Sequence, residues 1–561
     1  MKRLTAELVG RICQHLCPHC QSPDSFPHST TETRQAKTAL ARLSRTSRSM
    51  RVVAQPFVFH YYATGNLPEI FPEHWGGYSY DGDDGPSEGD DRLPRFLHTI
   101  IERPDLAKCV QGLQLVGSGE VDGCLPWRKK GSALSAVRQA SIELDVVAFN
   151  FFHPYYDNWT SARPDPRPTR GRPSYGDVHH TLGQLAILLC PNLSMLFLMG
   201  DFSRSFYGRL LRHSSRTLPA LKTVGVLSES RKHHYAHAGR LLALATNLET
   251  IYAADLQDCE LPYRSWTPAF DGPFPNARKV VAHNLGPIAL STLIQSCPQL
   301  RDFQYAHTAD FPSGPPLTYR DIVRAVKPVR TTLRRLAFLI QTNDESFGEA
   351  NDESDGESND GSLGESNDGS LDGPNDEPDG GSLDESLRLD EPLDESLDDP
   401  LDESRDMSLA GVHVPIKSLA HFEALEELVI PHEAIYGRTG KEQRIPGGFA
   451  RLLPRSISKL PIIYSEGGDT LKNDLEALAR DAPRVLPKLR SVTVSWREVD
   501  WFPRFGDEDV VAEELEKAFA AVGIVLGWDT DDSGDESQDI PGLVVEGVAA
   551  RGSHRASKVI Y

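Results

Sequence analysis

Residues 193–198 read LSMLFL and residues 221–226 read LKTVGV, and both stretches place apolar residues at their first, fourth and sixth positions. This pattern decides the fold because it returns along the chain, mostly 23 to 33 residues apart. It begins at Val110, Leu193, Leu221, Leu248, Ala277, Leu300, Leu333, Leu425, Ile457 and Leu489. Side chains two apart on a strand lie on the same face, so each occurrence predicts a short strand with one buried face.

Segments with helical apolar spacing lie between several of these strands. They are 182–190, 239–245, 289–296, 322–326 and 471–479. Strand, turn and helix therefore alternate at a near-constant period, which resembles the leucine-rich repeat, whose units bury their apolar faces only by stacking. An ordinary α/β sheet also alternates strands and helices, but it has no reason to keep a period. We predict an α/β solenoid, an irregular leucine-rich-repeat horseshoe.

The 92 residues from Leu333 to Leu425 break the period, and they contain an acidic tract at 343–406. Removing its 64 residues leaves 92 − 64 = 28, the period of the neighbouring units. The tract has 25 Asp and Glu against two Arg, a net charge of −23, so the rest of the chain carries −21 + 23 = +2. Its apolar content is too low to offset the entropy of ordering it, and we predict a disordered insertion between two repeats.

The sequence indicates no secretion signal in its first residues and no membrane-spanning segment. The first residues lack the charged, apolar and cleavage regions of a signal peptide, and no apolar run is long enough to span a bilayer. Eight scattered cysteines do not form a compact disulfide framework in 561 residues. We therefore expect an intracellular protein, cytoplasmic or nuclear, with reduced thiols.

The first 62 residues have a different, helical pattern. Thr5 can cap a helix whose first turn contains Glu7, and this helix would present Leu8, Ile12 and Leu16 along one stripe. A second helix is expected from about residue 32, with an apolar face and a basic face. Pro56 is expected to end or kink it.

Residues 1–62 resemble an F-box. The matching features are Leu4-x-x-Glu7-Leu8-x-x-x-Ile12-x-x-x-Leu16 and Leu40-x-x-Leu43-Ser-Arg45-x-x-Arg48-x-Met50-x-x-Val53-Ala54-x-Pro56. Two features depart from the usual motif: Thr5 replaces a proline, and residues 17–31 separate the helices where a short turn is typical. The pairing with repeats, and the residues around Cys17 and Tyr61, are similar to a fungal branch of F-box proteins.

The resemblance implies a substrate-recognition subunit of an SCF-type ubiquitin ligase. Its helices would dock on a Skp-family adaptor in a cullin complex, and its repeats would hold a substrate protein. The implied adaptor contacts are Leu4, Leu8, Ile12, Leu16, Leu40, Leu43 and Pro56. An alternative is that these residues only close a helical cap on a repeat scaffold that binds proteins and has no ligase role.

One side chain of each strand, between the paired apolar residues, should point away from the core. This outer row is Gln114, Phe197, Gly225, Tyr252, Val281, Gln304, Ala337, Val429, Pro461 and Thr493. The row has few charged residues. It therefore lacks the stripe of Lys and Arg that a nucleic-acid-binding surface needs to neutralise phosphates, which argues against nucleic-acid binding. We predict a protein-binding face with Phe197, Tyr252 and Gln304 as contacts, although such residues can equally pack beneath loops.

Possible metal ligands gather near the first helix: Cys13, His15, Cys17, His19, Cys20 and His28. Cys-x-x-Cys is the local spacing of a tetrahedral zinc site, but the second Cys pair of the usual motif is absent. The alternatives are a zinc site and a loop with small buried thiols. We favour the thiols and predict no metal and no cofactor.

The sequence contains none of the common catalytic motifs. There is no Gly-x-Ser-x-Gly elbow, no phosphate-binding P-loop and no dinucleotide fingerprint. His233 and His237 lie four apart but lack the adjacent Glu of zinc proteases. We expect a protein that is not an enzyme.

These patterns divide the chain into six segments. They are the F-box-like domain (1–62), a loop-rich linker (63–105), the first repeats (106–342), the acidic insertion (343–406), the second repeats with a C-terminal cap (407–528) and a disordered tail (529–561).

Overall fold

The structure is a computed structural model. It describes residues 5–21, 23, 26, 31–63, 93–116, 131–144, 175–199, 217–227, 244–254, 273–308, 317–341, 416, 418–436, 448–464, 470–496 and 508–529. The chain divides into two units, residues 1–342 with 409–561 and residues 343–408. All described residues belong to the first unit. The predicted acidic insertion and the predicted tail after Asp529 lie outside the described residues.

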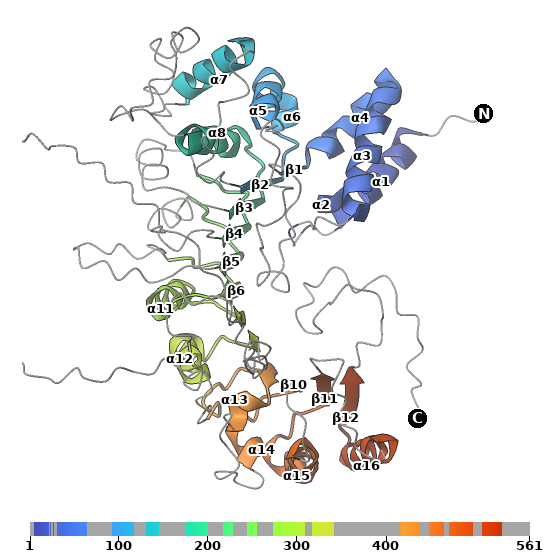
Figure 1. Cartoon of the computed structure of the whole chain (residues 1–561), viewed down its shortest axis with the longest axis vertical. Coiled ribbons are helices and arrows are strands. Elements are labelled where there is room, and N and C mark those ends of the chain that lie inside the picture. The colour runs from blue at the N-terminus through green and yellow to red at the C-terminus, as the bar shows by residue number, and fades with distance from the viewer. Residues whose placement is uncertain are drawn as a thin grey trace, which may run out of the picture. The chain divides into compact units, whose positions relative to one another are not determined.

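The described residues form one sheet of twelve strands, all parallel and hydrogen-bonded in chain order (Figure 1). The strands are β1 (Tyr61–Ala63), β2 (Gly112–Val116), β3 (Met195–Met199), β4 (Thr223–Leu227), β5 (Thr250–Ala254), β6 (Lys279–His283), β7 (Asp302–Thr308), β8 (Arg335–Gln341), β9 (Glu427–Pro431), β10 (Lys459–Tyr464), β11 (Ser491–Trp496) and β12 (Val525–Asp529). The sheet is not closed into a barrel. Its strand order never reverses, as it would in a doubly wound sheet. The predicted α/β class is confirmed.

Helices lie on several of the connections between strands (Figure 1). They are α5 (Leu93–Glu102), α6 (Pro104–Ala107), α7 (Gly131–Glu143), α8 (Tyr175–Leu189), α11 (Pro287–Gln295), α12 (Tyr319–Val326) with the 3₁₀ turn η5 (Lys327–Val329), α13 (Glu433–Tyr436), α14 (Gly448–Leu452), α15 (Thr470–Val485) and α16 (Glu508–Ala521). Among the described residues, no helix combines the length and the apolarity that crossing a bilayer requires.

The predicted strand at each of the ten anchors is confirmed, and so is the face that it buries. All ten anchor residues are buried in one continuous core. The paired apolar residues that follow them point into the same core, such as Leu196 and Leu198 on β3 and Val224 and Val226 on β4. A parallel sheet that is covered by helices or turns on this face buries nearly all of these side chains.

Backbone hydrogen bonds join each unit to the next in the same way. The carbonyl of Ser194 accepts from the N–H groups of Lys222 and Thr223, at 2.8 and 3.0 Å. The carbonyl of Lys222 in turn accepts from Glu249 and Thr250, at 2.8 and 3.0 Å. Because each unit repeats this bond, adding a unit of the right length extends the sheet by one strand.

The same bonds continue across the predicted insertion. The carbonyl of Arg334 accepts from the N–H groups of Glu426 and Glu427, at 2.8 and 2.9 Å. Strands β8 and β9 therefore pair directly, with Arg335 opposite Glu427. The long interval from Leu333 to Leu425 joins two neighbouring strands.

The structure contains two helices, α5 and α7, that were not predicted. Residues 93–102 of the predicted linker form α5, which buries Leu93, Leu97 and Ile100. Pro94 is the second residue of α5, and proline is tolerated in the first turn of a helix, where its missing N–H has no partner to lose. Residues 131–143, within the predicted first repeats, form α7, for which no helix was predicted.

The N-terminal residues form four helices: α1 (Ala6–Leu16), α2 (Pro18–Gln21), α3 (Thr31–Thr46) and α4 (Arg48–Phe59) (Figure 1). Thr5 caps α1 as predicted, accepting from the N–H of Leu8 at 3.4 Å. The predicted second helix is divided at Ser47, whose hydroxyl caps α4 by accepting from Met50 N–H at 3.1 Å. The helix then continues through Pro56 to Phe59, so Pro56 does not end it, as one of the two predicted alternatives had it. A new helix begins after Ser47 because the hydroxyl of Ser47 caps the N-terminus of α4.

Candidate functional site

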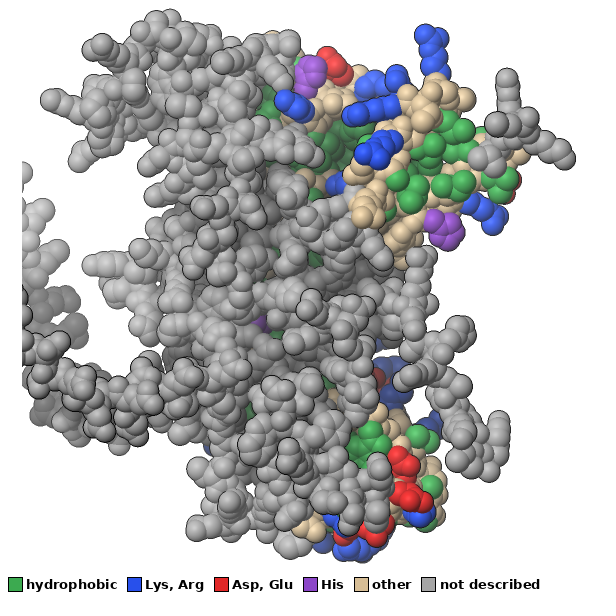
Figure 2. All heavy atoms as spheres, turned by 45° about the vertical axis from the view of Figure 1, so that its right-hand side comes forward, with side chains coloured by type: hydrophobic (Ala, Val, Ile, Leu, Met, Phe, Trp, Pro, Cys, Tyr) green, Lys and Arg blue, Asp and Glu red, His purple; other side chains and the backbone are tan. Residues whose placement is uncertain are grey.

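Helix α1 carries apolar side chains on two adjacent stripes. Val9 and Cys13 are 3% and 0% exposed and pack with Leu40 in the core of the helical unit. Leu8 and Ile12, one position earlier on each turn, are 50% and 43% exposed. Residues four apart lie on the same face of a helix, so these two form an apolar stripe at the surface, the α1 stripe. Figure 2 shows hydrophobic side chains gathered on this part of the molecule beside Lys and Arg.

The seven predicted adaptor contacts differ in how far they reach the surface. Leu8 and Ile12 are exposed. The half-buried members are Leu16, Leu43 and Pro56. Leu40 is 0% exposed, so it is a core residue of the helical unit and its predicted role as an adaptor contact does not fit its burial. Leu4 lies outside the described residues. Val52 of α4 is 76% exposed, and the predicted contacts did not include it.

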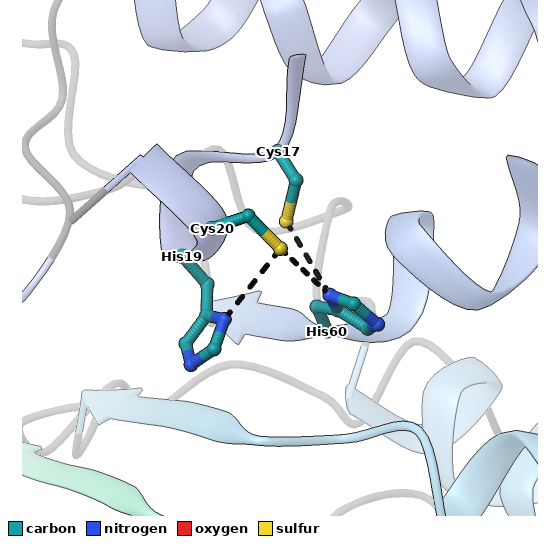
Figure 3. A group of neighbouring side chains, drawn as sticks. All are labelled: Cys17, His19, Cys20 and His60. Atoms are coloured by element: carbon teal, nitrogen blue, oxygen red, sulfur yellow. Dashed lines mark hydrogen bonds between the residues drawn. The ribbon is translucent and has the colours of Figure 1, made fainter. Parts of the chain in front are cut away.

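A cluster of two thiols and two imidazoles lies where three helices end or begin. Cys17 is the residue at the C-terminal end of α1, and α2 carries His19 and Cys20. His60 follows the last residue of α4 and directly precedes β1. Figure 3 shows the His60 ring directed toward both sulfur atoms, with His19 on the other side of Cys20. We call these four residues the Cys/His cluster.

The possible ligand atoms of the Cys/His cluster all lie within 4.8 Å of one another. His60 Nδ1 lies 3.3 Å from Cys20 Sγ and 3.7 Å from Cys17 Sγ, and Cys20 Sγ lies 4.0 Å from His19 Nδ1. Cys17 is 0% exposed and His19 is 6% exposed, whereas Cys20 and His60 are half-buried. The His60 ring also packs on Phe57, with centroids 4.8 Å apart. The cluster is therefore a compact, largely enclosed set of soft donor atoms.

The two thiols of the cluster have different acidities. A hydrogen bond from Cys20, aided by a second from His60, lowers the pKa of Cys17 well below the usual thiol value. The same interaction with Cys17, together with burial, raises the pKa of Cys20. The pairing thus favours one thiolate, at Cys17, and that is the form in which sulfur binds metals.

The structure brings together only part of the predicted ligand set. Cys17, His19 and Cys20 meet in the cluster, whereas Cys13 is buried in the helical core and its pKa is raised by that burial. His15 is exposed at the end of α1, and His28 lies outside the described residues, as do His233 and His237. The fourth member, His60, was missed because nothing local in the sequence links it to residues 40 positions earlier.

The predicted outer row is aligned strand by strand. The register places Gln114 opposite Phe197, Phe197 opposite Gly225 and Gly225 opposite Tyr252. It continues to Gln304 through Val281. Phe197 and Gln304 are buried, and Tyr252 is half-buried.

Phe26, from the segment between α2 and α3, packs on this row. Its ring centroid lies 5.2 Å from that of Phe197 and 5.5 Å from that of Tyr252, and both pairs meet edge to face. Phe26 itself is 7% exposed. Two of the predicted substrate contacts, Phe197 and Tyr252, therefore contact another part of the same chain.

No protein-family model matches this sequence, and no curated protein matches it either.

Proposed function

We propose that this chain is the substrate-recognition subunit of an SCF-type ubiquitin ligase, and that its helical unit docks on a Skp-family adaptor of a cullin complex. The observation that supports this most is the α1 stripe. Leu8 and Ile12 are half exposed on a helix whose neighbouring stripe is already buried. A partner that covers them would bury apolar surface without disturbing the core. This is the binding mode in which the apolar face of a helix lies in a hydrophobic groove of its partner. The F-box resemblance of residues 1–62 indicates which partner this is.

We further propose that the twelve-stranded sheet is a leucine-rich-repeat solenoid. Three features support this: the period of the apolar pattern, the unbroken strand order and the carbonyl that links each unit to the next. In a solenoid each unit contacts only the units next to it in the sequence, as the strand order here requires.

The solenoid would hold a substrate protein on its outer row, with Phe197, Tyr252 and Gln304 as the central contacts. Tyr252 is the most accessible of the three, and a substrate that reaches Phe197 must displace Phe26. The chain would make or break no bond itself. It would raise the effective concentration of a target lysine near a ubiquitin carried by other subunits.

The test is binding between the purified full-length chain and a purified Skp-family adaptor, measured by surface plasmon resonance. Leu8→Asp with Ile12→Asp should weaken binding at least about tenfold, because burying one such side chain contributes about 1.5–3 kcal/mol. The control is Gln14→Asp, an exposed position on the other side of α1, which adds one negative charge where the double variant adds two. It should bind like the parent chain.

The proposal fails if the parent chain shows no affinity for the adaptor, or if the double variant binds as well as the control. In that case the protein-binding scaffold without a ligase role becomes the better description. Circular dichroism spectra of both variants should match the parent, since Leu8 and Ile12 lie outside the core.

A further inference from the structure

We propose that Cys17, His19, Cys20 and His60 together bind one zinc ion. This site is independent of the proposed ligase role, because none of its residues belongs to the α1 stripe. It also differs from the site that the sequence alone suggests, since the fourth ligand comes from the end of α4.

The spacing of the donor atoms fits a tetrahedral ion. Zinc–sulfur and zinc–nitrogen bonds of about 2.3 and 2.0 Å place neighbouring ligand atoms about 3.3–3.8 Å apart. His60 Nδ1 lies 3.3 and 3.7 Å from the two sulfur atoms, and the His19 Nδ1 to Cys20 Sγ distance is 4.0 Å. An ion at the centre therefore requires only small movements of side chains that already face one another (Figure 3).

The donor set selects the metal. Two sulfur and two imidazole nitrogen atoms suit zinc, whereas calcium and magnesium require oxygen ligands. Four protein ligands leave no open position for water or substrate, and Cys17 and His19 are buried. The site is therefore structural. On binding, both sulfur atoms bond to the ion as thiolates, any remaining thiol proton passes to solvent, and no oxidation state changes.

The ion would join three parts of the chain, two of which, α1 and α4, already share the core of the helical unit. Cys17 ends α1, His19 and Cys20 belong to the four-residue α2, and His60 ends α4. A helix as short as α2 gains little stability from its own hydrogen bonds. An ion bound by its two middle residues, His19 and Cys20, would stabilise it. The backbone carbonyl of His60 accepts from Gln111 and Gly112 N–H at 2.9 and 2.8 Å, so the same residue also starts the sheet. The zinc site would fix the helical unit to the first strands.

The experiment uses the full-length chain, produced without a polyhistidine tag in zinc-supplemented medium. Metal content measured by inductively coupled plasma mass spectrometry should give one zinc per chain. Cys20→Ser and His60→Asn should each lose that zinc. Cys13→Ala and Cys109→Ala, cysteines of the same chain outside the cluster, should retain it.

A second measurement covers the case in which the ligand variants do not fold. Cobalt added to the metal-free parent chain should give the visible ligand-field bands of a tetrahedral site and a sulfur-to-cobalt charge-transfer band. Adding zinc should then abolish both. A chelator should lower the thermal unfolding midpoint of the parent, and restored zinc should recover it.

Two results would overturn the site. One is a parent chain that purifies with substoichiometric zinc and gives an octahedral cobalt spectrum, which would mean that hydrogen bonds alone hold the cluster. The other is a Cys17–Cys20 disulfide in protein kept with a thiol reductant. Neither result bears on adaptor binding, which is measured separately.

Discussion

At the scale of single residues, Gly225 decides how the outer row is packed. It lies between Phe197 of β3 and Tyr252 of β5 in the register. A Cβ atom added here would collide with the ring of Phe197 and would lie 3.1 Å from Cε2 of Phe26. The absent side chain therefore makes room for the edge-to-face contact between the two phenylalanines.

We predict that Gly225→Ala lowers the free energy of unfolding by about 1–3 kcal/mol, the usual cost of overfilling a packed site. Urea denaturation followed by circular dichroism measures it. Gly10→Ala is the control, because nothing lies within 4 Å of a Cβ added at this position inside α1. Alanine is the better helix former, so this change should stabilise the protein by about 0.5–1 kcal/mol. Equal stability of Gly225→Ala and the parent would contradict the packing described here.

At the scale of elements, strands β6 to β10 have side chains of alternating charge at their first residues. In register these are Lys279, Asp302, Arg335, Glu427 and Lys459. Arg335 Nη1 lies 3.6 Å from Asp302 Oδ2, and its Nε lies 3.0 Å from Glu427 Oε1. Opposite charges on neighbouring strands stabilise the pairing. This row helps to fix the register of β8 and β9 across the interval that contains the acidic tract.

We predict that Arg335 and Glu427 are energetically coupled by about 1 kcal/mol in a double-mutant cycle with Arg335→Gln and Glu427→Gln. Their side chains are 19% and 26% exposed, so solvent screens them only in part. The control is the pair next to them, Arg334 and Glu426, at 3.7 Å and 57% exposed on both sides. Its coupling should be about 0–0.5 kcal/mol. Equal coupling in both pairs would show that burial has no influence on this interaction.

At the scale of the whole molecule, the acidic tract separates two halves of the sheet in sequence but not in space. Residues 343–408 form a unit of their own, while β8 and β9 pair directly. The pairing of β8 with β9 therefore does not depend on the length of the acidic tract.

We predict that replacing residues 343–408 by a short Gly-Ser linker leaves the sheet intact. The shorter connection should raise the free energy of unfolding by about 1–2 kcal/mol, because closing a shorter loop costs less entropy. Removing the tract takes the net charge from −21 to about +2, so isoelectric focusing should show a large basic shift. Thermal melts at low protein concentration measure the stability. Loss of the cooperative transition would show that the tract belongs to the fold.

The positions of strands β2 to β11 were predictable because each depends on a local pattern, whereas β1 (Tyr61–Ala63) lacks that pattern and was not predicted. Apolar residues two apart, preceded by an anchor three positions earlier, specify a strand wherever they occur, and the register of the outer row followed from the same alignment of units. Helix α5 was missed because Pro94 and the surrounding composition masked a helical spacing of apolar residues. The division between α3 and α4 was missed because one serine cap is a weak signal within a continuous helical pattern.

The sequence by itself thus determined the α/β class, the order of the units and the face that each strand buries, since these follow from periodicity within a few residues. Only the tertiary structure decided which residues meet across the chain. It placed His60 against Cys17 and Cys20, and Phe26 on Phe197. The physical reason is that residues far apart in the sequence meet only when whole helices and strands pack. The spacing of residues along the sequence does not specify which of them will then be in contact.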